Sequence, residues 1–339
     1  MSSEAAQGGG THAFCASLLA RGELDRAGAS LAAIGFDVQL PAPGVLQVAS
    51  GRSGAPRVLL SAGVHGDEVG PLELLADVLA QLHEEASRDH TALACDMMIA
   101  IGNPPALAAG KRFVSTDLNR LFGSRHDSME ASAEAQRAAV LMRAVDTFFR
   151  ESGPQRWHFD LHSTIRASLY PSFAVVPQIG PEPEPALLAW LAHAGIDAAI
   201  LTTLPSTTFS GWTARQHHAC SATLELGRIA LLGQTDLRSL AATGMALQRL
   251  LRDELPASGS PPRFRVVQEL RKHSEAFRAR FDANAPNFTR FAAGSLIAED
   301  DAISYRAGSC DEYVVFPNPD VRVGLRAGLM VVREGLDLA

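Results

Sequence analysis

Two histidines and a glutamate have the types and spacing of a metal site. His65 and Glu68 stand three residues apart in the segment HGDE (65–68), so both can reach one ion if the loop bends around it. Imidazole nitrogens and carboxylate oxygens bind zinc at about 2.0–2.2 Å, and a catalytic zinc commonly has three protein ligands. His162, in DLHS (160–163), offers the third ligand. The prediction is one zinc ion per chain, although a pair such as His65 and Glu68 taken alone is most often a surface histidine and glutamate.

Glu225 is the candidate general base. It stands between leucines in the strand-like segment TLELG (223–227), where an unpaired buried carboxylate would be costly. Zinc lowers the pKa of its water, and a nearby carboxylate can take the proton as the water attacks a carbonyl. The same group can then protonate the leaving nitrogen. The alternative is a glutamate on the exposed face of an edge strand.

Cations and an amide are concentrated in residues 111–120. Because arginine binds carboxylates through two parallel hydrogen bonds, Arg112 and Arg120 are candidate substrate-binding residues, and Asn119 can position a second polar group. The alternative is a solvated loop with ordinary ion pairs. The segment is not a phosphate loop, because a Walker motif needs a glycine where Pro105 stands.

Alternating strands and helices are expected to position these side chains. Short apolar runs and helical periodicity predict the elements. Strands are expected at 45–50, 57–62, 97–101, 158–161, 173–176, 198–202 and 222–226, and helices at 71–82, 131–149, 184–194 and 236–252. This order predicts an α/β domain with a mostly parallel sheet flanked by helices. Functional residues of such sheets gather at the carboxyl ends of strands, so His65, His162 and Glu225 are expected at one edge.

The chain is expected to divide into two domains. Residues 1–10 are polar and glycine-rich, and we expect them to be disordered. The segment PASGSPP (256–262) is the best linker candidate. After it, short strands separated by turns are typical of a smaller β-rich domain. The prediction is a catalytic domain at 11–255 and a β-rich domain at 256–339.

Composition excludes several classes of protein. The chain has 339 residues and a net charge of -7, which argues against a nucleic-acid partner. We find no apolar run long enough to span a membrane and no secretory signal. Four cysteines are scattered through the chain and form no CxxC pair, which favours reduced thiols in a cytoplasmic protein. The expected partner is a small molecule.

Taken in order, several segments resemble the succinylglutamate desuccinylase and aspartoacylase family of zinc carboxypeptidase-like hydrolases. They are GVHGDEVGPLELL (63–75), GNPPALAAGKRFVSTDLNRLFG (102–123), DLHS (160–163), FSGWTARQHHACSATLELGRIALLGQTDL (209–237) and VVFPNPDVRVGLRAGLMV (314–331). The resemblance covers most of the chain from about residue 45. The last two segments look closer to the bacterial desuccinylases than to aspartoacylase.

The resemblance implies a fold, a site and a reaction. The fold is a carboxypeptidase-like α/β domain followed by a β-rich domain. The site is zinc on His65, Glu68 and His162 with Glu225 as acid/base, and the substrate's carboxylates bind the cations and the amide of residues 112–120. The reaction is hydrolysis of N-succinyl-L-glutamate to succinate and glutamate, the last step of arginine breakdown by the succinyltransferase route.

Two other functions are kept as alternatives. One is an aspartoacylase-like hydrolase acting on another acidic N-acyl amino acid. Arg215 favours it, because aspartoacylase has an arginine at the matching place. The other is a metal-binding regulatory protein without turnover, which would have no need of Glu225. Arg166 is a further candidate for binding substrate, whereas His217 and His218 are expected to be structural or solvent-facing. The oligomeric state is left open.

Overall fold

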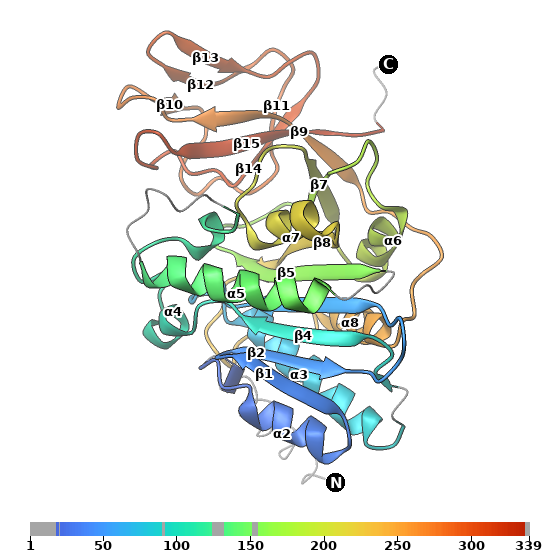
Figure 1. Ribbon diagram of the computed structural model, residues 1–339. Helices are drawn as coiled ribbons and strands as arrows, with labels where there is room; N and C mark the ends of the chain where they lie inside the picture. Colours follow the sequence, from blue (N-terminus) through green and yellow to red (C-terminus); the bar gives the residue numbers. More distant parts are fainter. Residues whose placement is uncertain (1–17, 20, 90–91, 124–131, 151–154, 336–339) are drawn as a thin grey trace, which may run out of the picture.

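The computed structural model describes residues 18–19, 21–89, 92–123, 132–150 and 155–335. It has a large sheet with helices on both faces, and a C-terminal β domain extends one end of that sheet (Figure 1). The predicted α/β class with a β-rich C-terminal domain is therefore confirmed. The expected disorder of residues 1–10 lies outside the described residues.

The main sheet has 12 strands. In spatial order these are β1 (Asp37–Ala42), β2 (Val45–Ala49), β4 (Asp96–Ile101), β3 (Arg57–Ala62), β5 (Arg156–Thr164), β8 (Cys220–Arg228), β6 (Ser172–Pro177), β7 (Ala198–Thr202), β9 (Arg263–Arg271), β15 (Arg326–Arg333), β14 (Glu312–Val315) and β11 (Thr289–Phe291). Strand β3 pairs in parallel with β4 and β5, and β5 pairs in parallel with β8. The carboxyl ends of these central strands therefore meet at one edge, as the alternation of strands and helices predicts.

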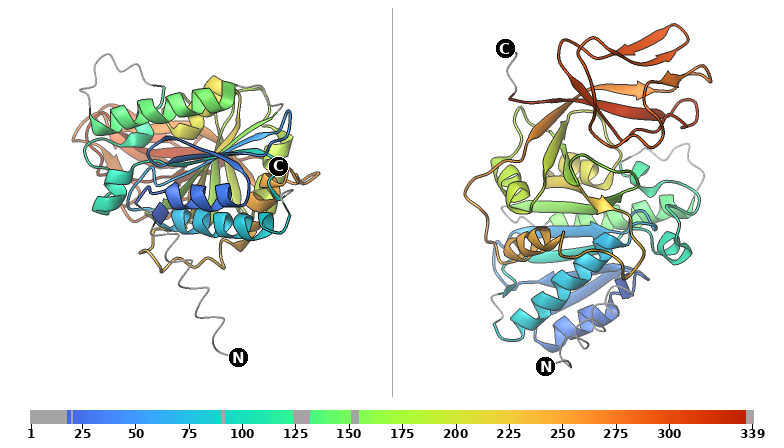
Figure 2. Two further views of the ribbon diagram at one scale, coloured as in Figure 1. Left: turned by 60° about the horizontal axis from the view of Figure 1, so that its bottom comes forward. Right: turned by 180° about the vertical axis from the view of Figure 1, so that it is seen from behind.

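Helices cover both faces of the sheet (Figure 2). On one face lie α2 (Asp25–Ala33), α3 (Gly70–Ala86), α6 (Pro185–His193) and α8 (Ala241–Leu251), and on the other α5 (Ala133–Arg150) and α7 (Phe209–His217). Strand β5 shows the division most clearly. Its residues Trp157, Phe159 and Leu161 enter the apolar core with α3 and α8, while the ring of His158 packs on Phe209 of α7. Alternate residues of β5 thus present a polar row to the α7 side.

Several elements differ from the sequence-based expectation. Helices α2, α4 (Pro104–Ala109) and α7 and strand β1 were not expected. Helix α7 contains Gly211 and Thr213, which weaken a helical pattern. Its N-cap is Thr208, whose hydroxyl accepts a hydrogen bond from the Gly211 amide. Helix α8 begins at Ala241, five residues later than expected, because Asp236 starts a turn. Strands β5 and β8 are longer than expected, so His162 lies inside a strand instead of after it.

The C-terminal strands continue the main sheet through parallel pairing of β7 with β9. A second, three-stranded sheet contains β10 (Arg278–Ala279), β12 (Leu296–Asp300) and β13 (Ile303–Arg306). A separate apolar core joins the two sheets of this region. The boundary at residue 256 stays a prediction. None of the helices in the described part of the chain is long and apolar enough to cross a membrane.

Candidate active site

The loop between β3 and α3 carries His65 and Glu68. It leaves the buried strand through Gly63, whose φ of 67° favours glycine. The next glycine, Gly66, packs against α4 so closely that a Cβ atom would lie 2.2 Å from the carbonyl carbon of Ala106. The glycines of this segment therefore bend the loop back on itself, which brings both side chains to the same side.

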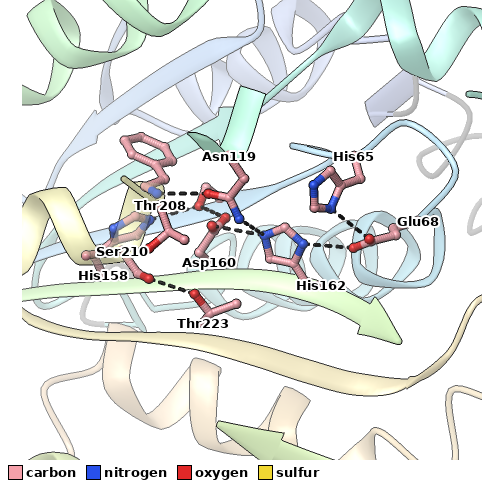
Figure 3. A network of polar contacts seen from close by, with 12 residues as sticks. His65, Glu68, Asn119, His158, Asp160, His162, Thr208, Ser210 and Thr223 are labelled. Atoms are coloured by element: carbon pink, nitrogen blue, oxygen red, sulfur yellow. Dashed lines mark hydrogen bonds and ion pairs between the residues drawn. The ribbon is translucent and has the colours of Figure 1, made fainter. Parts of the chain in front are cut away.

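His65, Glu68 and His162 form a buried cluster that can hold a metal ion (Figure 3). Their candidate ligand atoms all lie within 4.8 Å of one another. Nδ1 of His65 lies 2.8 Å from Oε1 of Glu68, and Nδ1 of His162 lies 2.8 Å from Oε2. The three side chains thus turn their donor atoms toward a common point. Their assignment as metal ligands stays a prediction, which we take up below.

The second ring nitrogen of each of these histidines, Nε2, lies close to a carboxylate. Nε2 of His65 lies 3.1 Å from Asp117, and Nε2 of His162 lies 3.0 Å from Asp160. Histidines that bind metals commonly donate their other N–H to a carboxylate, which fixes the tautomer and leaves the ligand nitrogen unprotonated. These two aspartates are not among the residues predicted from the sequence. The alternation of His158, Asp160 and His162 along one strand was the available signal.

Glu68 is held in its charged form. Burial opposes its ionisation, but His162 and His65 outweigh burial and hold the pKa of Glu68 well below its usual range. The backbone N–H of Ser163 and the guanidinium of Arg112 also donate to its oxygens, at 3.0 and 2.9 Å. A carboxylate that stays ionised among imidazoles is suited to binding a divalent cation.

Glu225 lies beside this cluster. In the parallel pairing of β5 with β8 it is the direct neighbour of His162, and the residue is 8% exposed. Its carboxylate accepts no hydrogen bond from the residues that the structure describes. Burial raises the pKa of Glu225 to about 7, and the charge of Glu68 adds to this, while His162 and Arg112 oppose it. A carboxyl group that titrates near neutrality can both accept and return a proton.

The raised pKa of Glu225 predicts a pH-dependent stability of the metal-free protein. In the unfolded chain the group titrates near 4.5, and in the fold near 7. Between these values the folded state holds the extra proton, so stability falls as the pH rises through this window. We expect the Glu225→Gln variant to gain on the order of 3 kcal/mol relative to wild type between pH 4.5 and pH 8. Denaturant unfolding of chelator-treated protein measures this, and a constant difference across the range would contradict it.

The three predicted substrate-binding residues differ in their burial and in how directly they contact the metal cluster. Asn119 is buried, with its amide nitrogen 3.4 Å from Nε2 of His162 and its oxygen accepting the Phe209 N–H at 2.9 Å. Arg112 reaches Glu68 directly. Arg120 is more exposed and donates to the carbonyl of Asn119. Their roles toward substrate stay predictions.

The other candidates lie elsewhere. Arg215 of α7 is exposed and donates to the carbonyl of Ser206. His217 pairs with Asp146 at 3.0 Å, near the amino end of β5, where Arg156 donates to its carbonyl. The metal cluster lies toward the carboxyl ends of the same strands, so His217 belongs to the opposite side of the domain.

Comparison with known proteins assigns the family. The description "Succinylglutamate desuccinylase/Aspartoacylase catalytic domain" matches residues 54–251, and "AstE/AspA barrel-sandwich hybrid domain" matches residues 259–334. The chain belongs to the succinylglutamate desuccinylase/aspartoacylase family. A curated member of this family from Burkholderia pseudomallei, named succinylglutamate desuccinylase, is 42% identical over 285 residues, which cover 83% of this chain and 80% of that protein.

Solved structures of this family have the same fold. The succinylglutamate desuccinylase of Vibrio parahaemolyticus is 33% identical with a TM-score of 0.81, and the match covers 88% of each chain. The enzyme of Chromobacterium violaceum is 34% identical with a TM-score of 0.78 over 90% of this chain and 92% of that one. These similarities agree with the resemblance read from the sequence motifs, and they make this chain a member of a hydrolase family.

Proposed function

We propose that this protein is a zinc-dependent hydrolase that converts N-succinyl-L-glutamate to succinate and L-glutamate. The observation that carries the proposal is the meeting of His65, Glu68 and His162 with Glu225 at one edge of the sheet. It occurs in a chain that is 42% identical to a protein named succinylglutamate desuccinylase. On this proposal the protein acts in the last step of arginine breakdown by the succinyltransferase route.

The donor set supports zinc as the metal. Two imidazole nitrogens and one carboxylate are a ligand set of catalytic zinc sites, whereas magnesium and calcium prefer oxygen ligands alone. Asp117 and Asp160 lie next to Nε2 of His65 and of His162, and metal-binding histidines usually have a carboxylate partner of this kind. When bound, zinc would polarise the amide carbonyl and make water a better nucleophile at neutral pH.

Glu225 has the position and the proton affinity of an acid/base catalyst. As the water attacks the amide carbon, its carboxylate takes the water's proton. As the C–N bond breaks, it gives that proton to the leaving nitrogen of glutamate. Its carboxylate forms no hydrogen bond with another side chain of the described residues, so its oxygens are available to accept the proton. Burial also keeps bulk water from competing for the proton.

The local charge supports an anionic substrate. N-succinyl-L-glutamate carries three carboxylates, and the net charge of the chain is -7, so binding depends on local cations. Arg112 reaches the metal cluster, and Arg120 follows Asn119 on the same 3-10 turn, Leu118–Arg120. We assign these three side chains to the carboxylates of the substrate, which guanidinium and amide groups bind by directed hydrogen bonds.

An assay of purified protein tests the proposal. N-succinyl-L-glutamate, N-acetyl-L-aspartate and N-acetyl-L-glutamate are supplied with and without a chelator. We expect hydrolysis of the succinyl compound to be fastest, to stop on chelation and to return on addition of zinc. Faster hydrolysis of N-acetyl-L-aspartate would favour the aspartoacylase-like alternative. The absence of chelator-sensitive hydrolysis of any of the three would favour a metal-binding protein without turnover.

A further inference from the structure

His158 is a buried histidine outside the group of candidate metal ligands. It lies on β5 with its ring fully buried, and Figure 3 shows it in one row with Asp160 and His162. Burial lowers the pKa of His158 to about 4, so the ring is neutral at physiological pH. A neutral imidazole has one N–H donor and one acceptor nitrogen. The hydrogen-bond partners of the ring therefore decide which nitrogen carries the proton.

Hydroxyl groups contact both nitrogens of this ring. In the parallel register of β3 with β5, Ser61 is the neighbour of Asp160, and its Oγ lies 2.8 Å from Nε2 of His158. On the other side of the ring, Nδ1 lies 2.7 Å from Oγ1 of Thr213 in α7. The hydroxyl of Ser221, the neighbour of His158 on β8, lies 2.9 Å from that of Thr213. These side chains are all buried, so they form one hydrogen-bonded chain inside the domain.

The carboxylate of Asp160 sets the direction of these hydrogen bonds. A carboxylate can only accept, and the hydroxyl of Ser61 donates its single hydrogen to Oδ1 of Asp160 at 2.6 Å. Ser61 must then accept from His158, which places the ring proton on Nε2. Nδ1 is therefore the acceptor, and the hydroxyl of Thr213 donates to it. Donation from Thr213 to the carbonyl of Ser210 instead, at 3.0 Å, would leave two acceptors facing each other at 2.7 Å.

Asp160 connects this chain to the candidate ligand His162. Its other oxygen, Oδ2, lies 3.0 Å from Nε2 of His162, whose Nδ1 faces Glu68 in the metal cluster. Because the hydroxyl of Ser61 holds one oxygen of the carboxylate, the other oxygen keeps its place beside Nε2. A metal-binding histidine that donates from one nitrogen to a carboxylate has a fixed orientation and a fixed tautomer. The groups behind Asp160 therefore bear on the direction in which Nδ1 of His162 points.

We propose that Ser61 and His158 are positioning residues of the metal site, which orient Asp160 and through it the ligand His162. This inference rests on the proposed function, because it takes His162 as a zinc ligand. Neither residue belongs to the group of three candidate ligands. The required form of His158 carries its proton on Nε2. Helix α7, which supplies Thr213, thereby contributes to the metal site from a distance.

NMR of protein with isotope-labelled histidine tests the direction of the hydrogen bonds. We expect Nε2 of His158 to carry the proton and Nδ1 to be unprotonated, both with zinc and after chelation. Loss of signals in the His158→Gln variant assigns them to this ring. An unprotonated Nε2 would overturn the proposal, because Ser61 would then donate to His158 and could not donate to Asp160.

Zinc affinity, measured by competition with a coloured chelator, tests the positioning role without turnover. We expect Ser61→Ala and His158→Leu to weaken zinc binding roughly 10-fold, the low end of the range for side chains that support a metal ligand. His158→Gln should recover most of this affinity, because its amide can donate to Ser61 from nearly the position of Nε2. A glutamine variant that binds zinc no better than the leucine variant would overturn the role of His158. If His158→Leu does not fold, Ser61→Ala decides alone, because it removes only one hydroxyl group.

Thr243→Val is the matched control for Ser61→Ala. Thr243 is a buried residue of α8, on the other face of the sheet, and its hydroxyl donates to the carbonyl of Ala194 at 2.8 Å. Both substitutions remove a buried hydrogen bond, so both should lower the unfolding temperature of the metal-free protein. Zinc affinity of the control should stay within about twofold of wild type, because distant sites act independently. Equal losses of zinc affinity in the two variants would show a general loss of stability and overturn the proposal.

The wild-type protein separates this inference from the proposed function. Wild-type zinc affinity in Ser61→Ala would overturn the inference even if the wild type hydrolyses N-succinyl-L-glutamate. A wild type that binds zinc but hydrolyses none of the three assayed compounds would contradict the proposed function, and the affinity of Ser61→Ala would still decide the inference. A wild type that binds no zinc would contradict both.

Discussion

Replacing Glu225 with glutamine should lower turnover of N-succinyl-L-glutamate by roughly two to four orders of magnitude, the range for a lost general acid/base. Glutamine has nearly the same size and can still accept a hydrogen bond, but it cannot take a proton at neutral pH. Because Glu225 is buried beside His162 in the strand register, the amide should occupy the same space. Steady-state kinetics at saturating substrate measure the effect.

The zinc content of this variant separates two roles of the residue. Glu225 lies outside the group of three side chains whose ligand atoms face one another. We therefore expect the variant to bind zinc as wild type does, at about one ion per chain. Glu225→Asp, which keeps an acid one methylene further away, should have intermediate turnover. Loss of zinc from Glu225→Gln would mean that Glu225 is a ligand and that its assigned role is wrong.

Replacing His162 with alanine should remove the metal and abolish hydrolysis. Nδ1 of His162 faces the carboxylate of Glu68 at 2.8 Å, so the substitution leaves one imidazole and one carboxylate. Removing a side chain that hydrogen-bonds to a metal ligand typically weakens metal binding 10- to 100-fold. Removing the ligand itself should weaken metal binding by more than about 100-fold. Elemental analysis after dialysis against a weak chelator, together with the assay, measures both effects.

A second histidine provides the matched control for His162→Ala. His217 lies near the other end of β5 and pairs with Asp146. His217→Ala should keep wild-type zinc content and activity within about twofold, because substitutions at distant sites with no shared partners act independently. If His162→Ala retained zinc with wild-type affinity, the assignment of the ligand set would be wrong.

Local patterns in the sequence predict most of the main sheet. The apolar runs at 57–62 and 198–202 coincide with β3 and β7, because a strand covered on both faces is apolar throughout. Helix α7 has no such pattern, since Gly211 and small polar residues interrupt it. It is stabilised by packing of Phe209 and Trp212 against the sheet, which depends on contacts distant in sequence.

The part of the site around His65 could be predicted from the sequence, because a recognisable motif there follows the end of a predicted strand. The strand, glycine turn and helix around His65 point to the loop, and the family motifs then suggest the ligand set. The neighbouring positions of His162 and Glu225 depend on the register of β5 against β8, which local sequence does not encode.

Titration of the metal-free protein with zinc tests whether one bound ion makes this protein a hydrolase. Chelator-treated protein receives increasing amounts of zinc while hydrolysis of N-succinyl-L-glutamate is followed. We expect the rate to rise in proportion to bound zinc and to stop rising at about one equivalent per chain. Full hydrolysis before zinc is added, or bound zinc without hydrolysis, would contradict it.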